Sequence, residues 1–352
     1  MKKEFRVKIS VPELVEGRTK LNEQRSEMDD FKCDTDRMDN RFQNFLTEQN
    51  HTWKLSANNY SGLHHVEEQT FFFDGFRIKL QFNPERMRSS AAKVDKKSIE
   101  ARKCFLCTEN RPEEQNSLDL GNNFLLLVNP FPIFRNHFTI PCVWHTPQRL
   151  IGNLEALFEI ARQMEGYSLF YNGPESGASA PDHLHFQAGE NGFMPVEAEF
   201  EILKLSPESL LIQSEDMQIR AFDHYLRKMI SFETTSLWEG IRAIEYLCSR
   251  FREIQPEKVE PMINLICYYG NGKWTLHFFP RRMHRPWQFF EEGNRRLLIS
   301  PASVDFGGVF ITPRREDFEK ITATDIADIF EQVSLDAANF EQLKASIKNY
   351  RL

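Results

Sequence analysis

The sequence lacks a long apolar stretch, and none of its runs approaches the roughly 18–20 apolar residues that a membrane helix needs. Residues 1–10 are charged and have no apolar segment after their lysines, so we expect no signal peptide.

Acidic residues outnumber basic ones, 51 to 44, and the formal net charge is −7. This balance argues against a nucleic-acid partner, because phosphate backbones are held mainly by clustered Lys and Arg. A small phosphorylated substrate needs only a local cationic pocket.

Cysteines are also few. The chain has six, scattered apart from the pair Cys104 and Cys107. This usage is typical of a reduced, cytoplasmic protein. Two cysteines separated by two residues form half of a common zinc ligand set, and histidines would have to complete it, with His137, His145 and His183 as candidates. Such a metal would be structural, because four protein ligands leave no open position. The alternative is two unligated cysteines in a loop.

At 352 residues, the chain is long enough for two modest domains or one large one. Hydrophobic patterns predict strands near residues 124–128, 138–143, 167–171, 183–188, 263–269, 274–279, 297–300 and 308–312. They also predict helices near 148–165 and 235–254 and a last helix from 324. Asn271-Gly272 is a strong hairpin signal between two of these strands. Strand pairs followed by a helix recur in both halves, which indicates a duplication, although no residue-level repeat accompanies it.

The segment His183-Leu184-His185-Phe186-Gln187 carries the clearest chemical signal. As a strand, it would place His183, His185 and Gln187 on one face, with successive side chains roughly 6.5–7 Å apart. The alternative is the solvent face of an edge strand, where Lys, Glu and Thr would be more usual. We therefore interpret this segment as a polar row that lines a site.

An unprotonated imidazole is a competent nucleophile at neutral pH. Attack by His185 on the α-phosphorus of a nucleotide would give a nucleotidyl-imidazole, which divides one hard displacement into two easier ones. Gln187 can donate a hydrogen bond to a phosphate oxygen but cannot exchange a proton near neutral pH. This combination favours transfer to an acceptor that supplies its own nucleophile over hydrolysis.

Two further stretches could contact phosphate. The loop over residues 172–179 is rich in Gly and Ser, and such loops can form anion-holding concavities, although many are simple turns. Residues 85–103 are the most basic stretch of the chain. This stretch is either a solvated loop or an arm that contacts phosphate.

The pattern His183-x-His185-x-Gln187 after a Gly/Ser loop resembles the transferase branch of the histidine-triad superfamily. That branch includes galactose-1-phosphate uridylyltransferase, diadenosine tetraphosphate phosphorylase and plant GDP-L-galactose phosphorylase. The sequences of residues 183–188 and 146–150 are similar to segments of plant GDP-L-galactose phosphorylase. Residues 104–107 instead resemble the zinc-binding segment of the uridylyltransferases. The resemblance covers residues 75–190 well and 270–312 more loosely.

The resemblance implies an α+β fold, in which helices pack on a histidine-triad-like antiparallel sheet built from two related halves. We expect an N-terminal extension over residues 1–70, a catalytic domain over 71–200 and a C-terminal half over 201–352. Related enzymes are often dimers, so a homodimer is a further expectation. Neither nucleic acid nor membrane is an expected partner.

The resemblance also implies roles for single residues. His185 would be the nucleophile, Gln187 would orient phosphate, and Asn129 would contact the ribose hydroxyls, where an aspartate is usual. Asn172, Gly177 and Ser179 match the phosphate loop, although Ser179 lies one residue further from His183 than in the uridylyltransferases. Cys104, Cys107, His145 and His183 match the structural zinc ligands. Arg86 and Arg88 are candidates for holding the acceptor or leaving phosphate.

The expected activity is transfer of a nucleoside monophosphate from a nucleoside diphosphate-sugar or a dinucleoside polyphosphate, through His185, to inorganic phosphate or a sugar phosphate. A nucleotide hydrolase, a non-catalytic nucleotide-binding protein and a zinc-dependent binding module are the alternatives.

Overall fold

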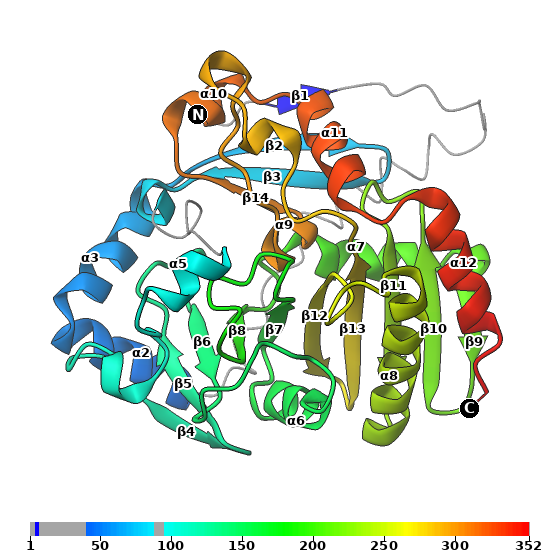
Figure 1. The fold of residues 1–352 in the computed structure, drawn as a ribbon, viewed down its shortest axis with the longest axis horizontal. Coiled ribbons are helices and arrows are strands. Elements are labelled where there is room, and N and C mark those ends of the chain that lie inside the picture. The colour runs from blue at the N-terminus through cyan, green and yellow to red at the C-terminus, as the bar shows by residue number, and fades with distance from the viewer. Residues whose placement is uncertain (1–3, 7–39, 88–94, 352) are drawn as a thin grey trace.

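The computed structural model describes residues 4–6, 40–87 and 95–351 (Figure 1). Its strands are β1 (Glu4–Arg6), β2 (Glu67–Phe73), β3 (Phe76–Phe82), β4 (Leu118–Gly121), β5 (Phe124–Val128), β6 (Phe138–Pro141), β7 (Tyr167–Asn172), β8 (His185–Glu190), β9 (Leu210–Gln213), β10 (Met217–Phe222), β11 (Met229–Thr234), β12 (Ile263–Gly270), β13 (Lys273–Pro280) and β14 (Val309–Thr312). Its α-helices are α2 (Asn40–Thr52), α3 (Lys54–Gly62), α5 (Lys96–Glu100), α6 (Leu154–Gln163), α7 (Pro195–Leu203), α8 (Leu237–Ile254), α9 (Ser303–Phe306), α10 (Arg315–Lys320), α11 (Ala323–Val333) and α12 (Ala337–Lys348).

A ten-stranded antiparallel sheet forms the centre of the molecule, in the order β4-β5-β6-β8-β7-β12-β13-β11-β10-β9. Each half supplies three strands that pair in sequence order, then a helix (α6 or α8), then a pair of strands. The order of the second five strands mirrors that of the first five, so the equivalent strands β7 and β12 meet in the middle. The predicted α+β fold with two related halves is thus confirmed, although the halves share no visible sequence repeat.

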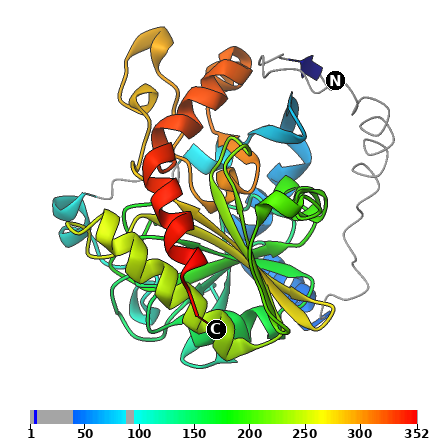
Figure 2. The ribbon, with the colours of Figure 1, turned by 90° about the vertical axis from the view of Figure 1, so that its right-hand side faces the viewer.

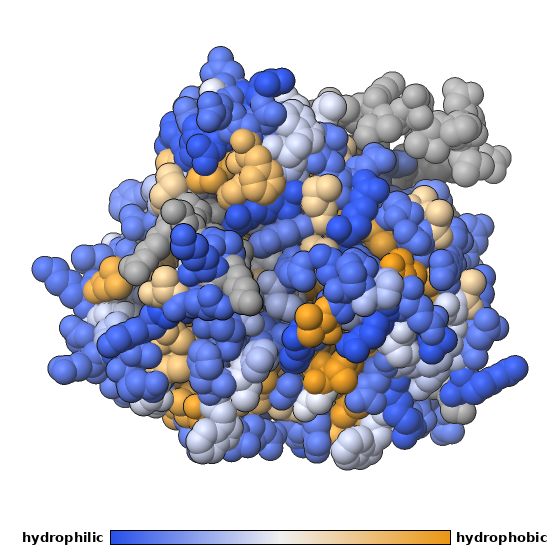
Figure 3. All heavy atoms as spheres, viewed as in Figure 1, coloured by the Kyte–Doolittle hydropathy of each residue, from blue (hydrophilic) through white to orange (hydrophobic). Residues whose placement is uncertain are grey.

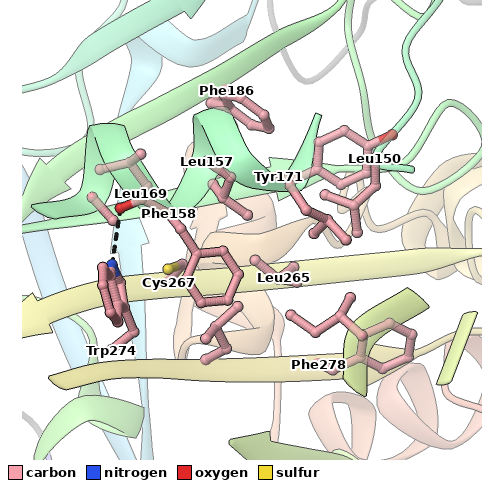
Figure 4. Close-up of a cluster of buried hydrophobic side chains, with 14 of the residues drawn as sticks. Leu150, Leu157, Phe158, Leu169, Tyr171, Phe186, Leu265, Cys267, Trp274 and Phe278 are labelled. Atoms are coloured by element: carbon pink, nitrogen blue, oxygen red, sulfur yellow. Dashed lines mark hydrogen bonds between the residues drawn. The ribbon is translucent and has the colours of Figure 1, made fainter. Parts of the chain in front are cut away.

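One face of this sheet packs against α2, α6, α8 and α12. The apolar residues of α6 recur at helical spacing and bury Leu157 and Phe158 against the strands. Figure 4 shows these side chains among residues from both halves, and Trp274 of β13 donates a hydrogen bond from Nε1 to the carbonyl of Phe158 at 2.9 Å. Since β7 and β12 contribute neighbouring rows to this cluster, the two halves share one hydrophobic core.

The opposite face carries a smaller sheet in the order β1-β2-β3-β14, seen at the top of Figure 1. Its apolar side chains pack with those of α7, α9, α10 and α11, and Figure 2 shows α11 and α12 running down one side of the molecule. β14 pairs in parallel with β3, so the C-terminal half completes a sheet that begins near the N-terminus. Buried Arg227 stacks on Tyr225 and pairs with Glu199 of α7, at 3.3 Å between Nη2 and Oε2.

Most predicted elements are present, with two corrections. Residues 297–300 do not form a strand: the N–H of Leu298 donates to the Asp317 carboxylate and that of Ile299 to the Leu297 carbonyl, so no strand ladder forms. The segment is apolar because it is buried. A short apolar run in the sequence does not distinguish a buried irregular segment from a buried strand. The helix predicted from residue 324 is confirmed as α11, but α12 follows it.

The expected N-terminal extension, residues 1–70, lies partly outside the described residues. Its described part contains β1, α2, α3 and the start of β2. No helix in the described part of the chain is long and apolar enough to cross a membrane. On the face shown in Figure 3, hydrophilic residues predominate and apolar ones form small groups among them.

Candidate active site

His185 is the first residue of β8, two positions later than the predicted strand start. Its Nδ1 lies 2.8 Å from the carbonyl oxygen of His183. A carbonyl can only accept a hydrogen bond, so Nδ1 must carry the proton. The Nε2 atom of neutral His185 therefore holds a lone pair, which is the form that a nucleophilic imidazole needs.

His185 is only 3% exposed. Burial, partly opposed by the hydrogen bond to His183, lowers the pKa of its imidazole to about 4. A pKa this far below neutrality keeps the ring unprotonated at physiological pH. The side chain of His185 is therefore neutral and correctly tautomerised before any substrate arrives.

Gln148 fixes the backbone of His185. Its Oε1 accepts from the His185 N–H at 2.8 Å, and its Nε2 donates to the carbonyls of His185 and Asn172, each at 3.0 Å. Gln148 is fully buried, so these bonds replace a ladder between the start of β8 and the end of β7. The resemblance over residues 146–150 includes Gln148, but the sequence alone gave it no role, because a single buried amide leaves no periodic signal.

Gln187 lies on the same face of β8 as His185, as the alternation predicted. Its Oε1 is 3.2 Å from His137 Nε2 and 3.4 Å from Asn129 Nδ2. Asn129 also donates to Thr139 Oγ1 at 3.0 Å. The structure thus brings Asn129 and Gln187 together, and adds His137 to the predicted set.

The Gly/Ser loop joins the end of β7 to the histidines. Asn172 Oδ1 accepts from Asn264 Nδ2 and from the Ser303 N–H, both at 2.8 Å. Gly177 has φ +98°, and an added Cβ would lie 2.7 Å from the Cβ of Ala302, so only glycine fits there. Ser179 is half-buried in the same loop. Residues of the second half therefore hold this loop beside His185.

Cys104, Cys107, His145 and His183 form a cluster whose ligand atoms all lie within 4.8 Å of one another. The Sγ of Cys104 is 3.3 Å from His183 Nδ1, and that of Cys107 is 3.2 Å from His145 Nδ1. A tetrahedral zinc site, with bonds of about 2.3 Å to sulfur and 2.0–2.1 Å to nitrogen, separates these atoms by about 3.5 Å. The geometry of the cluster therefore fits a metal.

The second ring nitrogen of His183 supports the same interpretation. Its Nε2 lies 2.8 Å from the carbonyl oxygen of Cys142, so Nε2 carries the proton and Nδ1 presents a lone pair to the cysteines. The imidazole of His183 thus points into the cluster rather than along the row of His185 and Gln187. His137, a candidate ligand from sequence alone, lies outside the cluster, beside Gln187.

Of the two predicted phosphate-binding arginines, Arg88 lies outside the described residues. Arg86 follows β3, and its Nη1 donates to the carbonyl of Phe131 at 2.6 Å. Burial lowers the pKa of Arg86 to about 10, which leaves the guanidinium charged at neutral pH. Phe131 belongs to the loop between Asn129 and His137, so Arg86 brings a positive charge to this side of the site.

Two family models match the chain: Domain of unknown function (DUF4922) over residues 45–190, and GDPGP1-like, C-terminal domain over residues 202–351. The yeast Ap4A phosphorylase Apa2 is similar in structure, with a TM-score of 0.54 and 16% identity over 82% of this chain and 97% of that one. The chain therefore has the histidine-triad-like fold that it shares with this protein.

Apa2 in complex with Ap4A aligns with the chain at a TM-score of 0.52, 16% identity and the same coverage. The alignment spans both halves of the histidine-triad-like fold. A comparison with curated protein sequences gave no significant match.

Proposed function

We propose that the chain is a nucleotidyltransferase or phosphorylase that forms a covalent nucleotidyl intermediate on His185. The observation that carries this proposal is the 2.8 Å contact from His185 Nδ1 to the His183 carbonyl. It fixes the tautomer that leaves Nε2 free to attack, and it offers an acceptor for the charge that develops on the ring. The similarity to Apa2, whose structure was determined with Ap4A, supports a nucleotide substrate.

In the first step, the Nε2 lone pair of His185 attacks the α-phosphorus of the donor. An N–P bond forms, and the bond from phosphorus to the bridging oxygen breaks. That oxygen leaves with the electron pair, as part of a sugar phosphate from a nucleoside diphosphate-sugar or of a nucleoside polyphosphate from a dinucleoside polyphosphate. In the second step, an oxygen of inorganic phosphate or a sugar phosphate attacks the same phosphorus. The N–P bond then breaks, and its electrons return to Nε2 of His185.

The surrounding residues supply charge and hydrogen bonds. Gln187 donates to a non-bridging oxygen of the α-phosphate, the loop over residues 172–179 offers backbone N–H groups, and Arg86 contributes positive charge. Asn129 is expected to reach the ribose. We also propose that the Cys/His cluster holds a structural zinc, because its two thiols and two imidazoles would fill all four tetrahedral positions.

A nucleotide hydrolase is the second candidate, because water could take the place of the phosphate acceptor. The amide of Gln187 favours transfer, since it cannot remove a proton from water. The dependence of turnover on added phosphate separates the two activities. A hydrolase would release the nucleoside monophosphate at the same rate without phosphate.

The test is intact-protein mass after mixing the chain with Ap4A, UDP-, ADP- or GDP-sugars in the absence of phosphate. The expected result is an increase of one nucleotidyl group, absent in His185→Ala and retained in His224→Ala, whose imidazole is fully exposed. Substrate turnover without any adduct, or full activity of His185→Ala, would overturn the covalent mechanism.

A further inference from the structure

His137 is a fully buried histidine that the proposed reaction does not use directly. It precedes β6, at the end of the loop that begins with Asn129, and its ring lies 5.2 Å from that of Phe134 and 6.0 Å from that of Phe170. Both ring nitrogens have identified partners. Nδ1 is 3.1 Å from the N–H of Ile133, and Nε2 is 3.2 Å from Gln187 Oε1.

The partners of the two ring nitrogens show which nitrogen of His137 carries the proton. The N–H of Ile133 can only donate, so Nδ1 accepts, and the proton of the neutral ring resides on Nε2. Burial and the nearby charge of Arg86 lower the pKa of His137 well below its ordinary value, which keeps the ring neutral. Nε2–H therefore donates to Gln187, and the atom that it meets must be the amide oxygen.

Asn129 makes the same assignment independently. Its Oδ1 accepts from the N–H of Phe131 at 3.0 Å, so its other terminal atom is Nδ2. This Nδ2 is also directed at Oε1 of Gln187, at 3.4 Å. Asn129 and His137, at the two ends of one loop, thus both donate to the side-chain oxygen of Gln187. The NH₂ group of Gln187 is then the part of the amide that can contact a ligand.

We propose that His137 is a positioning residue that locks the amide of Gln187 with its NH₂ group toward the phosphoryl group. This inference rests on the proposed function of His185. Without the lock, an amide can rotate and present either end, because its oxygen and nitrogen have nearly the same size. A net hydrogen bond of about 1 kcal/mol corresponds to roughly a fivefold preference for one orientation.

The fixed orientation of Gln187 also affects which molecule accepts the nucleotidyl group from His185. Water that attacks the nucleotidyl intermediate must lose a proton, and a rotated Gln187 would offer Oε1 to orient such a water. With Oε1 held by His137 and Asn129, Gln187 faces the intermediate as a donor only. A phosphate oxyanion attacks without losing a proton and can accept from that NH₂ group. The lock thus favours an anionic acceptor over water.

The test uses two substitutions that divide the functions of the imidazole. In His137→Asn, the side-chain oxygen can take the place of Nδ1 and accept from Ile133, but the side chain is too short to reach Gln187. In His137→Gln, the terminal NH₂ group can take the place of Nε2 and donate to Gln187. His137→Gln is therefore the matched rescue variant, and urea unfolding of both establishes that they fold.

With a nucleotide donor, we expect His137→Asn to lower kcat for transfer to phosphate about fivefold and to raise the fraction of intermediate that reacts with water. His137→Gln should retain most of the wild-type ratio. In selectively labelled protein, the side-chain NH₂ resonances of Gln187, assigned with Gln187→Ala, should move or broaden in His137→Asn alone. An unchanged product ratio and unchanged resonances in folded His137→Asn would overturn the inference.

Failure of the proposed function has a different signature. If wild-type protein forms no adduct on His185, the covalent mechanism is wrong, but the amide resonances still report whether His137 orients Gln187. If the adduct forms normally and His137→Asn changes neither readout, only the role of His137 is wrong.

Discussion

Asn172 and Asn264 lie opposite each other where the central strands of the two halves meet, with Asn264 Nδ2 2.8 Å from Asn172 Oδ1. The same Nδ2 is 2.8 Å from the carbonyl oxygen of Ser176 in the Gly/Ser loop. Oδ1 of Asn264 accepts from Arg281 Nη1 at 2.8 Å. The second half thus holds the loop that precedes the nucleophile, although it contributes no residue to the His185–Gln187 row.

Asn264→Asp should weaken both stability and substrate binding. It keeps the shape of the side chain but replaces the donor with an oxygen that faces two acceptors in Asn172 and Ser176. Leaving buried acceptors without a donor costs about 1–3 kcal/mol, which urea unfolding would measure. KM for the nucleotide donor should rise because the loop is no longer held. Asn116→Asp, at an exposed position, is the control and should leave both quantities unchanged.

Gly177→Ala should disturb the same loop from within. Its φ of +98° disfavours any L side chain, and the new Cβ would lie 2.7 Å from that of Ala302. Gly75→Ala is a matched control, because Gly75 has φ +78° but no atom within 4 Å of an added Cβ. We expect thermal or urea unfolding to show a loss of about 1 kcal/mol for Gly75→Ala and about 2–4 kcal/mol for Gly177→Ala. An equal loss of unfolding free energy in the two variants would mean that the loop around Gly177 can shift to accommodate the added Cβ without further destabilising the fold.

Local patterns in the sequence predicted the individual elements well. The alternation around His185 and Gln187 predicted their shared face, and Asn271-Gly272 predicted the hairpin between β12 and β13. The meeting of β7 and β12 could not be predicted, because the register of strands about 95 residues apart depends on the packing of both halves.

The supporting residues of the site were harder to predict than its chemical groups. Gln148 and His137 each act through a few directed hydrogen bonds, and a single buried polar residue leaves no periodic trace in a sequence. The sequence also left His137 among the candidate metal ligands. Residue type alone does not distinguish a histidine that binds zinc from one that donates a hydrogen bond to a neighbouring amide. His183 was assigned both to the polar row and to the zinc ligands. Its side chain faces the cysteines, as the second assignment expects, and leaves the row because the strand begins only at His185.

The Cys/His cluster predicts one zinc per chain by metal analysis. Cys104→Ser should lose the metal and lower the thermal midpoint, because a closed site formed by distant segments stabilises the folded state by several kcal/mol. Cys248→Ala is the control: this cysteine is buried in α8, away from the cluster. It should retain the full zinc content. A metal content of zero in fresh wild-type protein would show that the four side chains do not hold zinc.

The second half should not form a nucleotidyl adduct of its own. His277, in the strand β13 that is equivalent to β8, lies between Ser231 Oγ, at 2.9 Å, and Tyr268 OH, at 3.3 Å. The ring of Phe200 from α7 covers it at 4.8 Å between centroids. We therefore expect exactly one label per chain by intact mass and its location on the peptide that contains His185. A second label on His277 would contradict this assignment of one site per chain.

Glu197 should make the stability of the fold decrease with rising pH. Its carboxylate accepts from Ser168 Oγ at 2.5 Å and from the Gly192 N–H at 2.6 Å. Burial, only partly offset by these bonds, raises the pKa of Glu197 from 4.5 to about 7. The folded chain therefore holds a proton that the unfolded chain releases, and the free energy of unfolding falls as the pH rises from about 4.5 to 7.

A difference of this size corresponds to at most about 3 kcal/mol. Glu197→Gln removes the titration while keeping an amide that can accept from Gly192 and donate to Ser168. Urea unfolding at pH 5 and pH 8 should show a smaller loss for this variant than for wild type, whereas the exposed Glu208→Gln should behave as wild type. If Glu197→Gln loses as much stability as wild type between the two pH values, Glu197 is already ionised in the folded chain and its hydrogen bonds outweigh its burial.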